Sequence, residues 1–219
     1  MSPIGTQGHL SPSLGDLSFE ERLRLKSAQG RRCFGVDLKI VDEDGAPLPH
    51  DSEAAGELYV RGNSIVSGYF NNPEATAAVI DKDGWFGTGD VATIGPRGFL
   101  RITDRAKDLI KSGGEWISSI DVENLALAHP SVANAAVIAV PHPKWDERPL
   151  LVVVLAEGAA LDKDALNAHM AKTLAKWQLP DDVIAVEALP LTATGKVSKL
   201  TLRQQFGDHV LPDLHKERG

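Results

Sequence analysis

Hydrophobic and polar residues in the first half of the chain alternate in short runs that turn residues interrupt. The runs FGVDLKIVD, GELYVRG and SIVSGYF each have the length and pattern of a short strand, and loops separate them. NPEATAAVID predicts a helix with Pro73 in its first turn, and SFEERLRLKSA predicts an earlier, short charged helix. Residues 84–105 predict a hairpin that turns at Gly95–Gly98. We therefore expect this half to be mostly β.

The pattern changes after about Asp104. SSIDVENLALAHP predicts a helix capped by Ser118 or Ser119, and NAAVIAVP and PLLVVVLAE are apolar runs of strand length. DKDALNAHMAKTLAKWQLP predicts an amphipathic helix that Asp162 caps, and DVIAVEALP predicts a last strand. Four apolar side chains share one face of this helix, which we expect to pack on a sheet: Leu166, Met170, Leu174 and Trp177.

Together these patterns predict an α/β (α+β) chain in two parts. Residues 1–104 form a β-rich part, and residues 105–219 form a smaller domain in which helices pack on a short sheet. The element order expected for the second part is β–α–β–β–α–β. The boundary is expected at residues 104–108, inside a charged segment.

Composition narrows the possible functions. The chain has 219 residues, of which 42% are hydrophobic, and its net charge of −7 gives no indication of nucleic-acid binding. A single cysteine, Cys33, excludes an internal disulfide framework and suits a reducing compartment. Apolar runs such as LLVVVLA are too short to span a bilayer, and the first residues do not resemble a signal peptide. We expect a cytoplasmic protein.

The segment GWFGTGDVATIGPRGFLRITDRAKDLIKSGGEWIS carries more polar chemistry than a surface hairpin needs. In Thr88-Gly89-Asp90, a carboxylate at the end of a glycine turn could accept two hydrogen bonds from a vicinal diol such as a ribose. The alternative is an aspartate that caps its own turn. Arg105 and Lys107 could approach a phosphate or could lie in a solvated charged loop.

Two further glycine-containing segments have both a chemical and an ordinary interpretation. Gly113-Gly114 would let backbone approach a ligand, but a plain turn needs the same residues. LPLTATGKVSKLTLR is not a P-loop, because Pro190 stands where the first glycine should be and Val197 replaces Ser or Thr. It leaves Lys196 on a loop, either as a mobile positive charge or as a solvated turn residue.

The order and spacing of these motifs resemble the adenylate-forming (AMP-binding) superfamily. The resemblance rests on GELYVRG, SGYFNNPEAT, the segment quoted above, AAVIAVPHPKWDERP and LPLTATGKVSK, and it covers essentially the whole chain. The superfamily comprises acyl-CoA synthetases, peptide-synthetase adenylation domains and firefly luciferase. Within it, the sequence resembles bacterial fatty-acyl-CoA and methylmercaptopropionate-CoA ligases in particular. MSPIGT resembles the end of the family motif GMTEMSP, so we expect the C-terminal portion of a longer enzyme.

The resemblance implies roles for residues around the domain boundary. Asp90, with Thr88 in the same motif, matches the aspartate that binds both ribose hydroxyls of ATP and of the acyl-adenylate. Arg105 matches the arginine that contacts ribose and phosphate. Lys107 occupies the hinge about which the C-terminal domain turns between two half-reactions.

The resemblance also implies roles in the second part. Ser112, Gly113 and Gly114 match the loop that lines the pantetheine tunnel for CoA. Lys196 matches the catalytic lysine that contacts the carboxylate and the α-phosphate during adenylation. In some relatives this lysine is acetylated, which switches activity off. Lys111 matches a lysine that luciferase-like members use in the second half-reaction and other members lack.

The implied substrates are a carboxylic, fatty-type acid, ATP and CoA, and the implied products include AMP. The phosphate-binding loop, the acyl pocket and the glutamate that binds Mg²⁺ in the family are not in these 219 residues. We therefore expect no adenylate formation by this chain alone. One alternative is an idle module that binds nucleotide or CoA weakly or docks on a partner. Another is a peptide-synthetase adenylation domain, which the ending FGDHVLPDLHKERG disfavours.

Overall fold

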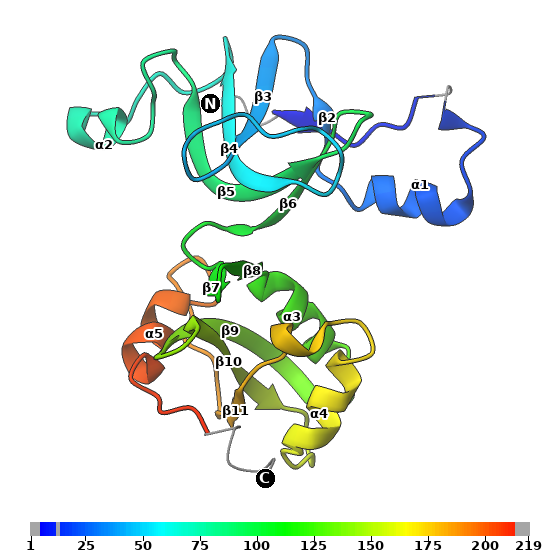
Figure 1. Ribbon diagram of the computed structural model, residues 1–219, viewed down its shortest axis with the longest axis vertical. Coiled ribbons are helices and arrows are strands. Elements are labelled where there is room, and N and C mark those ends of the chain that lie inside the picture. Colours follow the sequence, from blue (N-terminus) through cyan, green and yellow to red (C-terminus); the bar gives the residue numbers. More distant parts are fainter. Residues whose placement is uncertain (1–4, 12–13, 213–219) are drawn as a thin grey trace. The chain divides into compact units, whose positions relative to one another are not determined.

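The computed structural model describes residues 5–11 and 14–212, and the chain divides into two compact units, residues 1–107 and 108–219 (Figure 1). The first unit is an antiparallel sheet of six strands in the order β1-β2-β6-β5-β4-β3. Its elements are β1 (Thr6–Gln7), α1 (Phe19–Lys26), β2 (Gly30–Arg32), β3 (Val36–Val41), β4 (Ala55–Gly62), α2 (Pro73–Ala77), β5 (Phe86–Ile94) and β6 (Phe99–Arg105).

Local sequence explains most of the first unit. Ser18 accepts a hydrogen bond from the Glu21 N–H and the Glu21 carboxylate accepts one from the Ser18 N–H, so a capping box starts α1. The predicted turn at Gly95–Gly98 is confirmed, because the Gly95 N–H donates to Phe99 O at 3.0 Å. The core lies on one face of the sheet and contains Ile40, Leu58, Val60, Phe86, Ala92, Ile94 and Leu100.

The strand expected over SIVSGYF is wrong: these residues form a loop with one isolated bridge. Ile65 and Val66 pack against the core from this loop, so their apolar side chains are partly buried without sheet pairing. The Tyr69 N–H donates to Thr76 Oγ1 at 2.9 Å, a bond to α2 instead of to a neighbouring strand. The helix expected from Pro73 is confirmed but ends at Ala77.

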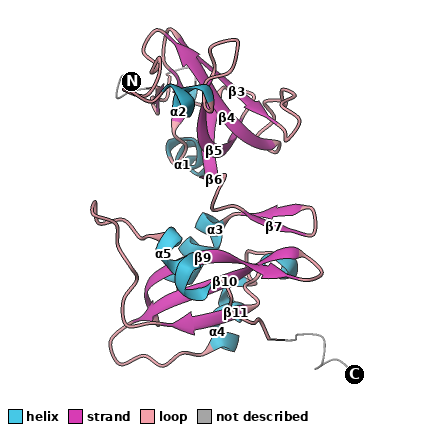
Figure 2. Cartoon of the chain, turned by 90° about the vertical axis from the view of Figure 1, so that its left-hand side faces the viewer, coloured by secondary structure: helices cyan, strands magenta, loops and turns pink. Residues whose placement is uncertain are grey.

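The second unit places helices on both faces of a small sheet (Figure 2). The long hairpin β9–β10 is antiparallel, β11 pairs parallel with β10, and β7–β8 joins the other end of β10. Its elements are β7 (Ile110–Ser112), β8 (Glu115–Ile117), α3 (Ser119–Leu127), β9 (Val132–His142), β10 (Asp146–Leu155), α4 (Lys163–Met170), the 3₁₀ helix η2 (Lys176–Gln178), β11 (Asp182–Ala185) and α5 (Lys199–Phe206).

Strand β10 is buried on both sides. Leu151 and Val153 face the cluster that includes α3 and α4, whereas Leu150 and Val152 face the cluster that includes Leu202 of α5. All four of these β10 side chains are completely buried. Continuous burial explains why residues 150–155 are apolar at every position instead of alternating.

The long amphipathic helix is only partly confirmed. Asp162 caps α4, and Leu166 and Met170 are buried as expected, but the helix ends at Met170 and Trp177 is 43% exposed. The carbonyls of Trp177 and Leu179 accept hydrogen bonds from Arg148 at 2.6 and 3.1 Å. In a helix that continued to Leu179 these carbonyls would lie in the last turn without an internal partner, and here Arg148 satisfies them. Helix α5 was not predicted.

Candidate functional site

Thr88, Gly89 and Asp90 lie inside β5, not in the expected turn. The pairing between β4 and β5 shifts here, because Glu57 is opposite Val91 whereas Tyr59 is opposite Gly87. Residues 88–90 are therefore opposite a single residue of β4, Leu58, and this mismatch is a β-bulge. Within the bulge Gly89 has a φ of +71°, which glycine adopts without strain. Thr88 Oγ1 fixes the bulge by donating to Leu58 O at 3.1 Å and accepting from the Asp90 N–H at 3.1 Å.

The bulge directs Asp90 towards the next strand. Arg105 is its register partner on β6, and Arg105 Nε lies 2.9 Å from Asp90 Oδ1. The Asp90 side chain is 18% exposed and that of Arg105 is 57% exposed. One N–H donor occupies only one of about four lone-pair sites of a carboxylate, so Asp90 can still accept bonds from a diol. This matches the chemistry expected of a ribose-binding aspartate.

Lys107 lies in the turn that follows β6 and is exposed. The Ala106 N–H donates to Gly89 O at 3.0 Å, which anchors the chain to the bulge immediately before Lys107. Asp108 follows and begins the second unit. Lys107 is therefore the last residue of the first unit and carries no strand or helix pairing of its own.

The β7–β8 hairpin carries four of the predicted site residues. Ser112 is opposite Glu115, so Gly113-Gly114 forms a two-residue turn with φ values of +61° and +88°. Positive φ at both central positions is the type I′ arrangement that glycine favours. A Cβ on Gly113 would lie 2.7 Å from the Trp145 ring, so the backbone must approach that ring closely. Lys111 is exposed and lies over the Trp116 ring, with Nζ 5.3 Å from its centroid.

Two residues that the sequence analysis missed hold this hairpin in place. Glu147 Oε2 accepts a hydrogen bond from the Lys111 N–H at 2.9 Å. Arg148 is buried, and its Nη1 donates to Ser112 Oγ at 2.8 Å. Its guanidinium also binds Asp181, with Nη2 at 2.6 Å from Oδ1 and Nε at 2.9 Å from Oδ2. The sequence did contain a signal for these two residues, namely the consecutive charges in DERP at the start of an otherwise apolar strand.

Lys196 lies on the exposed loop between β11 and α5. Leu191 and Val197 form a bridge at the base of this loop, and the Gly195 N–H donates to Thr192 O at 2.9 Å. The Lys196 N–H donates to Thr192 Oγ1 at 3.2 Å. The loop is therefore structured at its base and presents Lys196 to solvent.

The predicted site residues thus form three groups. Thr88, Asp90 and Arg105 come together in the first unit. Within the second unit, the β7–β8 hairpin and the loop that leads into α5 project from different sides in Figure 2. The hairpin that carries Gly114 and the loop that carries Lys196 therefore lie on different sides of the second unit.

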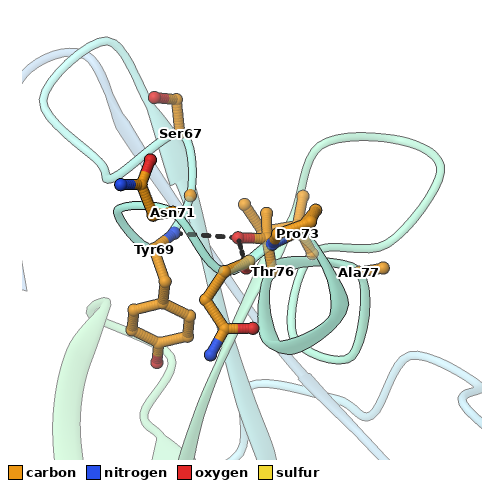
Figure 3. A pocket seen from close by; sticks show the side chains of 9 residues that line it. Ser67, Tyr69, Asn71, Pro73, Thr76 and Ala77 are labelled. Carbon is orange, nitrogen blue, oxygen red and sulfur yellow. Dashed lines mark hydrogen bonds between the residues drawn. The ribbon is translucent and has the colours of Figure 1, made fainter.

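Two hollows in the first unit are lined by none of the predicted site residues. One, of about 550 Å³, lies beside α2, where Thr76 Oγ1 donates to Asn72 O and accepts from the Tyr69 N–H (Figure 3). These bonds fold the loop onto α2, so the pocket follows from local structure. The other, of about 870 Å³, includes Arg61, which stacks on Trp85 at 4.4 Å from the ring centroid.

Residues 5–11 and 14–212 contain neither a metal-ligating cluster nor a membrane-spanning helix. No group of three or more His, Cys, Asp or Glu side chains in these ranges could hold a metal ion. Over the same residues, no helix has the length and apolar character needed to cross a membrane.

Comparisons with known proteins define the class of protein. Residues 5–70 match the family of AMP-binding enzymes, and residues 121–196 match the AMP-binding enzyme C-terminal domain. The chain belongs to the AMP-binding, adenylate-forming family, as its motifs predicted.

Among curated relatives, the chain is 55% identical over 208 residues to the 3-methylmercaptopropionyl-CoA ligase of Ruegeria pomeroyi, covering 95% of this chain and 38% of that protein. It is 47% identical over 211 residues to a medium-chain-fatty-acid–CoA ligase of Ectopseudomonas oleovorans, covering 96% and 38%. The chain therefore spans a little over a third of the length of these relatives.

A solved structure shares the fold. It is the o-succinylbenzoate CoA synthetase of Bacillus subtilis in complex with its acyl-adenylate intermediate, with a TM-score of 0.76 and 32% identity. The match covers 94% of this chain and 39% of that one. The α/β fold class expected from the sequence is thereby confirmed.

Proposed function

We propose that this chain supplies the ribose-binding aspartate, the hinge and the catalytic lysine of an ATP-dependent acyl-CoA ligase. The enzyme would activate a carboxylic acid of fatty type as an acyl-adenylate and transfer the acyl group to CoA. The names of the two curated relatives support this activity. The geometric observation that carries the proposal is the Asp90–Arg105 pair. The β5 bulge positions Asp90, and Arg105 lies two residues before Lys107.

In this proposal Asp90 accepts hydrogen bonds from the two ribose hydroxyls of ATP. Arg105 orients the Asp90 carboxylate before the nucleotide arrives, which lowers the reorganisation needed on binding. The exposed side of the Arg105 guanidinium then lies close to the ribose and phosphate edge.

Lys196 would act in the first half-reaction. The acid is a carboxylate, and it must attack the α-phosphate of ATP, which is also anionic. Lys196 supplies a positive charge where these two anions meet, and that charge stabilises the transition state in which pyrophosphate leaves. The structured base of the Lys196 loop limits the conformations that the lysine must search.

The β7–β8 hairpin would act in the second half-reaction. The side-chain-free turn Gly113-Gly114 allows the pantetheine arm of CoA to pass close to backbone, so that its thiol can attack the acyl-adenylate and release AMP. Lys196 and the hairpin lie on different sides of the second unit, so one rotation at Lys107 would exchange one for the other. Lys111 would accompany the hairpin, as in luciferase-like members.

Mg²⁺ normally neutralises the phosphates of ATP in such reactions. The described residues of this chain contain no carboxylate cluster that fits it, so we assign it no ligand here. The remaining lobe of the enzyme is its expected source of ligands. Cytoplasmic location and a role in fatty-acid metabolism stay predictions.

The test is a fusion in which this chain replaces the matching part of the Ruegeria pomeroyi ligase. We expect the fusion to catalyse ATP–pyrophosphate exchange with at least one acid from a series of short, medium and long carboxylic acids. It should then form the corresponding CoA thioester. Lys196→Ala in the fusion should abolish exchange but leave ATP binding measurable, whereas the 219-residue chain alone should show no exchange.

A fusion that folds, binds ATP and shows no exchange with any acid, while the parental Ruegeria ligase is active, would contradict the proposal. The idle binding module would then be the better description. Exchange by the 219-residue chain alone would contradict our expectation that the remaining lobe is required.

A further inference from the structure

An ion pair joins Asp108, the first residue of the second unit, to helix α5. Arg203 Nη1 of α5 lies 2.9 Å from Asp108 Oδ1, and 95 residues separate the two in the sequence. The side chains are 28% and 12% exposed, respectively, so this contact is more protected than a typical surface pair. Asp108 directly follows Lys107, which we propose as the hinge.

Helix α5 determines where the Lys196 loop ends. Ser198 caps α5 by accepting from the Thr201 N–H, and its own N–H donates to Pro190 O at 2.8 Å across the base of the loop. Leu202 is completely buried against the sheet. Any shift of α5 therefore displaces both ends of the loop that carries Lys196.

A second ion pair fixes the first turn of α5 to the body of the unit. Lys199 Nζ lies 2.7 Å from Glu123 Oε1 of α3 and 2.5 Å from Ser119 Oγ. Glu123 Oε1 also accepts from the Val137 N–H of β9 at 2.7 Å. Lys199 thus orients α5 relative to the sheet, whereas Arg203 orients it relative to Asp108.

We propose that Asp108–Arg203 is a positioning pair for the reaction: it ties α5, and through α5 the Lys196 loop, to the residue after the hinge. When the second unit rotates at Lys107, α5 and the Lys196 loop then move with it as one rigid body. Without the pair, the loop would be less firmly connected to the residue after the hinge. The inference rests on the proposed function, and neither Asp108 nor Arg203 is assigned a contact with substrate.

The proposal predicts a selective defect in the fusion enzyme. Arg203→Gln should lower kcat of ATP–pyrophosphate exchange by about tenfold or more, with little change in KM for ATP, because small misplacements of a catalytic group are costly. Transfer from a supplied acyl-adenylate to CoA should stay within about twofold, since that step does not use Lys196. Combining Asp108→Arg with Arg203→Asp should recover part of the exchange activity.

The matched control is Gln205→Ala, which changes an exposed residue on the same helix and should leave both half-reactions unchanged. Equal losses in the two half-reactions of Arg203→Gln, or no loss at all, would overturn the positioning role. Failure of the unsubstituted fusion in exchange would instead overturn the proposed function.

An amide-exchange measurement tests the mechanical link without any activity. In the 219-residue chain, Arg203→Gln should speed exchange at the loop amides of Gly195 and Lys196, which donate to Thr192. Amides of β10 should keep their protection, because that strand lies in the core. Unchanged exchange in the loop would overturn the link between Arg203 and Lys196.

Discussion

Asp90 and Arg105 are register partners on neighbouring strands, and their side chains meet with Arg105 Nε 2.9 Å from Asp90 Oδ1. The pair lies where β5 bulges, so the backbone irregularity and the charged contact occur at the same place. Bulges are frequent next to functional sites because they redirect a side chain. A carboxylate held in this way keeps acceptor sites that Arg105 does not occupy, and it contributes little to the core.

Asp90→Asn is expected to weaken ATP binding with little effect on folding. In the fusion enzyme, KM for ATP should rise about tenfold to a hundredfold, the range expected for losing hydrogen bonds to a charged group worth about 1.5–3 kcal/mol. The free energy of unfolding should change by less than about 1 kcal/mol, since Arg105 is mostly exposed. Kinetics and urea unfolding measure the two quantities.

Asp37→Asn is the matched control for that change. Asp37 pairs with Arg32 at 2.6 Å in the same sheet, and both side chains are exposed. Its KM for ATP should equal that of the unsubstituted fusion. Equal effects of Asp90→Asn and Asp37→Asn would show that Asp90 has no special contact with ATP.

The two turn glycines should respond differently to alanine. Gly113→Ala combines a positive φ with a Cβ 2.7 Å from the Trp145 ring, whereas Gly114→Ala meets open space at φ +88°. The left-handed backbone should cost each variant about 1–2 kcal/mol, and crowding should add about 1–3 kcal/mol to Gly113→Ala alone. Thermal unfolding of the 219-residue chain gives the comparison, and equal losses would contradict the close approach of Trp145.

Arg148 should be essential to the second unit's stability. Asp181→Ala leaves this buried guanidinium without its carboxylate, and we expect a loss of about 3–5 kcal/mol in the unfolding transition of that unit. Replacing both residues, with Arg148→Met and Asp181→Leu, should recover much of the loss because no buried charge remains. If Asp181→Ala costs less than about 1 kcal/mol, the pair behaves like a surface contact and this interpretation is wrong.

Acid should weaken the second unit partly through Asp182. Burial raises the pKa of Asp182, but hydrogen bonds from Lys163, His209 and the Val183 N–H outweigh burial and hold that pKa below its ordinary value. A folded-state pKa below the unfolded-state pKa gives stability that is present above the unfolded value of about 3.9 and lost as the pH falls through the folded value.

Asp182→Asn should therefore lower the free energy of unfolding at pH 7, and its difference from the unsubstituted chain should shrink as the pH falls from about 5 towards 2. Lys163→Met should shift the same loss to higher pH, because it removes one of the groups that lower the pKa of Asp182. Urea unfolding at several pH values measures both. A constant difference between Asp182→Asn and the unsubstituted chain across this range would contradict the assignment.

Local sequence signals predicted the elements that short-range contacts determine. Ser118 caps α3 by accepting from the Asp121 N–H, and the Gly95–Gly98 turn closes its hairpin, as their residue types indicate. The break before Trp177 could not be predicted in this way. The segment after the break is held by a long-range contact, because the Trp177 carbonyl accepts a hydrogen bond from Arg148, 29 positions away in the sequence.

The candidate site shows the same division. Motif order was sufficient to propose Asp90 and Lys196, and their roles stay predictions. The residues that hold the β7–β8 hairpin were missed, because Glu147 and Arg148 each reach their partners on β7 across 36 residues. Such long-range bonds have no periodic pattern in the sequence, so only the folded arrangement identifies them.

The double-sided burial of β10 also sets an order of local opening. Leu150 to Val153 are covered on both faces and pair with β9 on one side and β11 on the other, so their amides should be among the last in the chain to exchange with deuterium. The Gly113-Gly114 turn and the Lys196 loop are exposed and should open far more often. The two segments proposed to contact substrates can therefore open locally while the sheet that carries them stays folded.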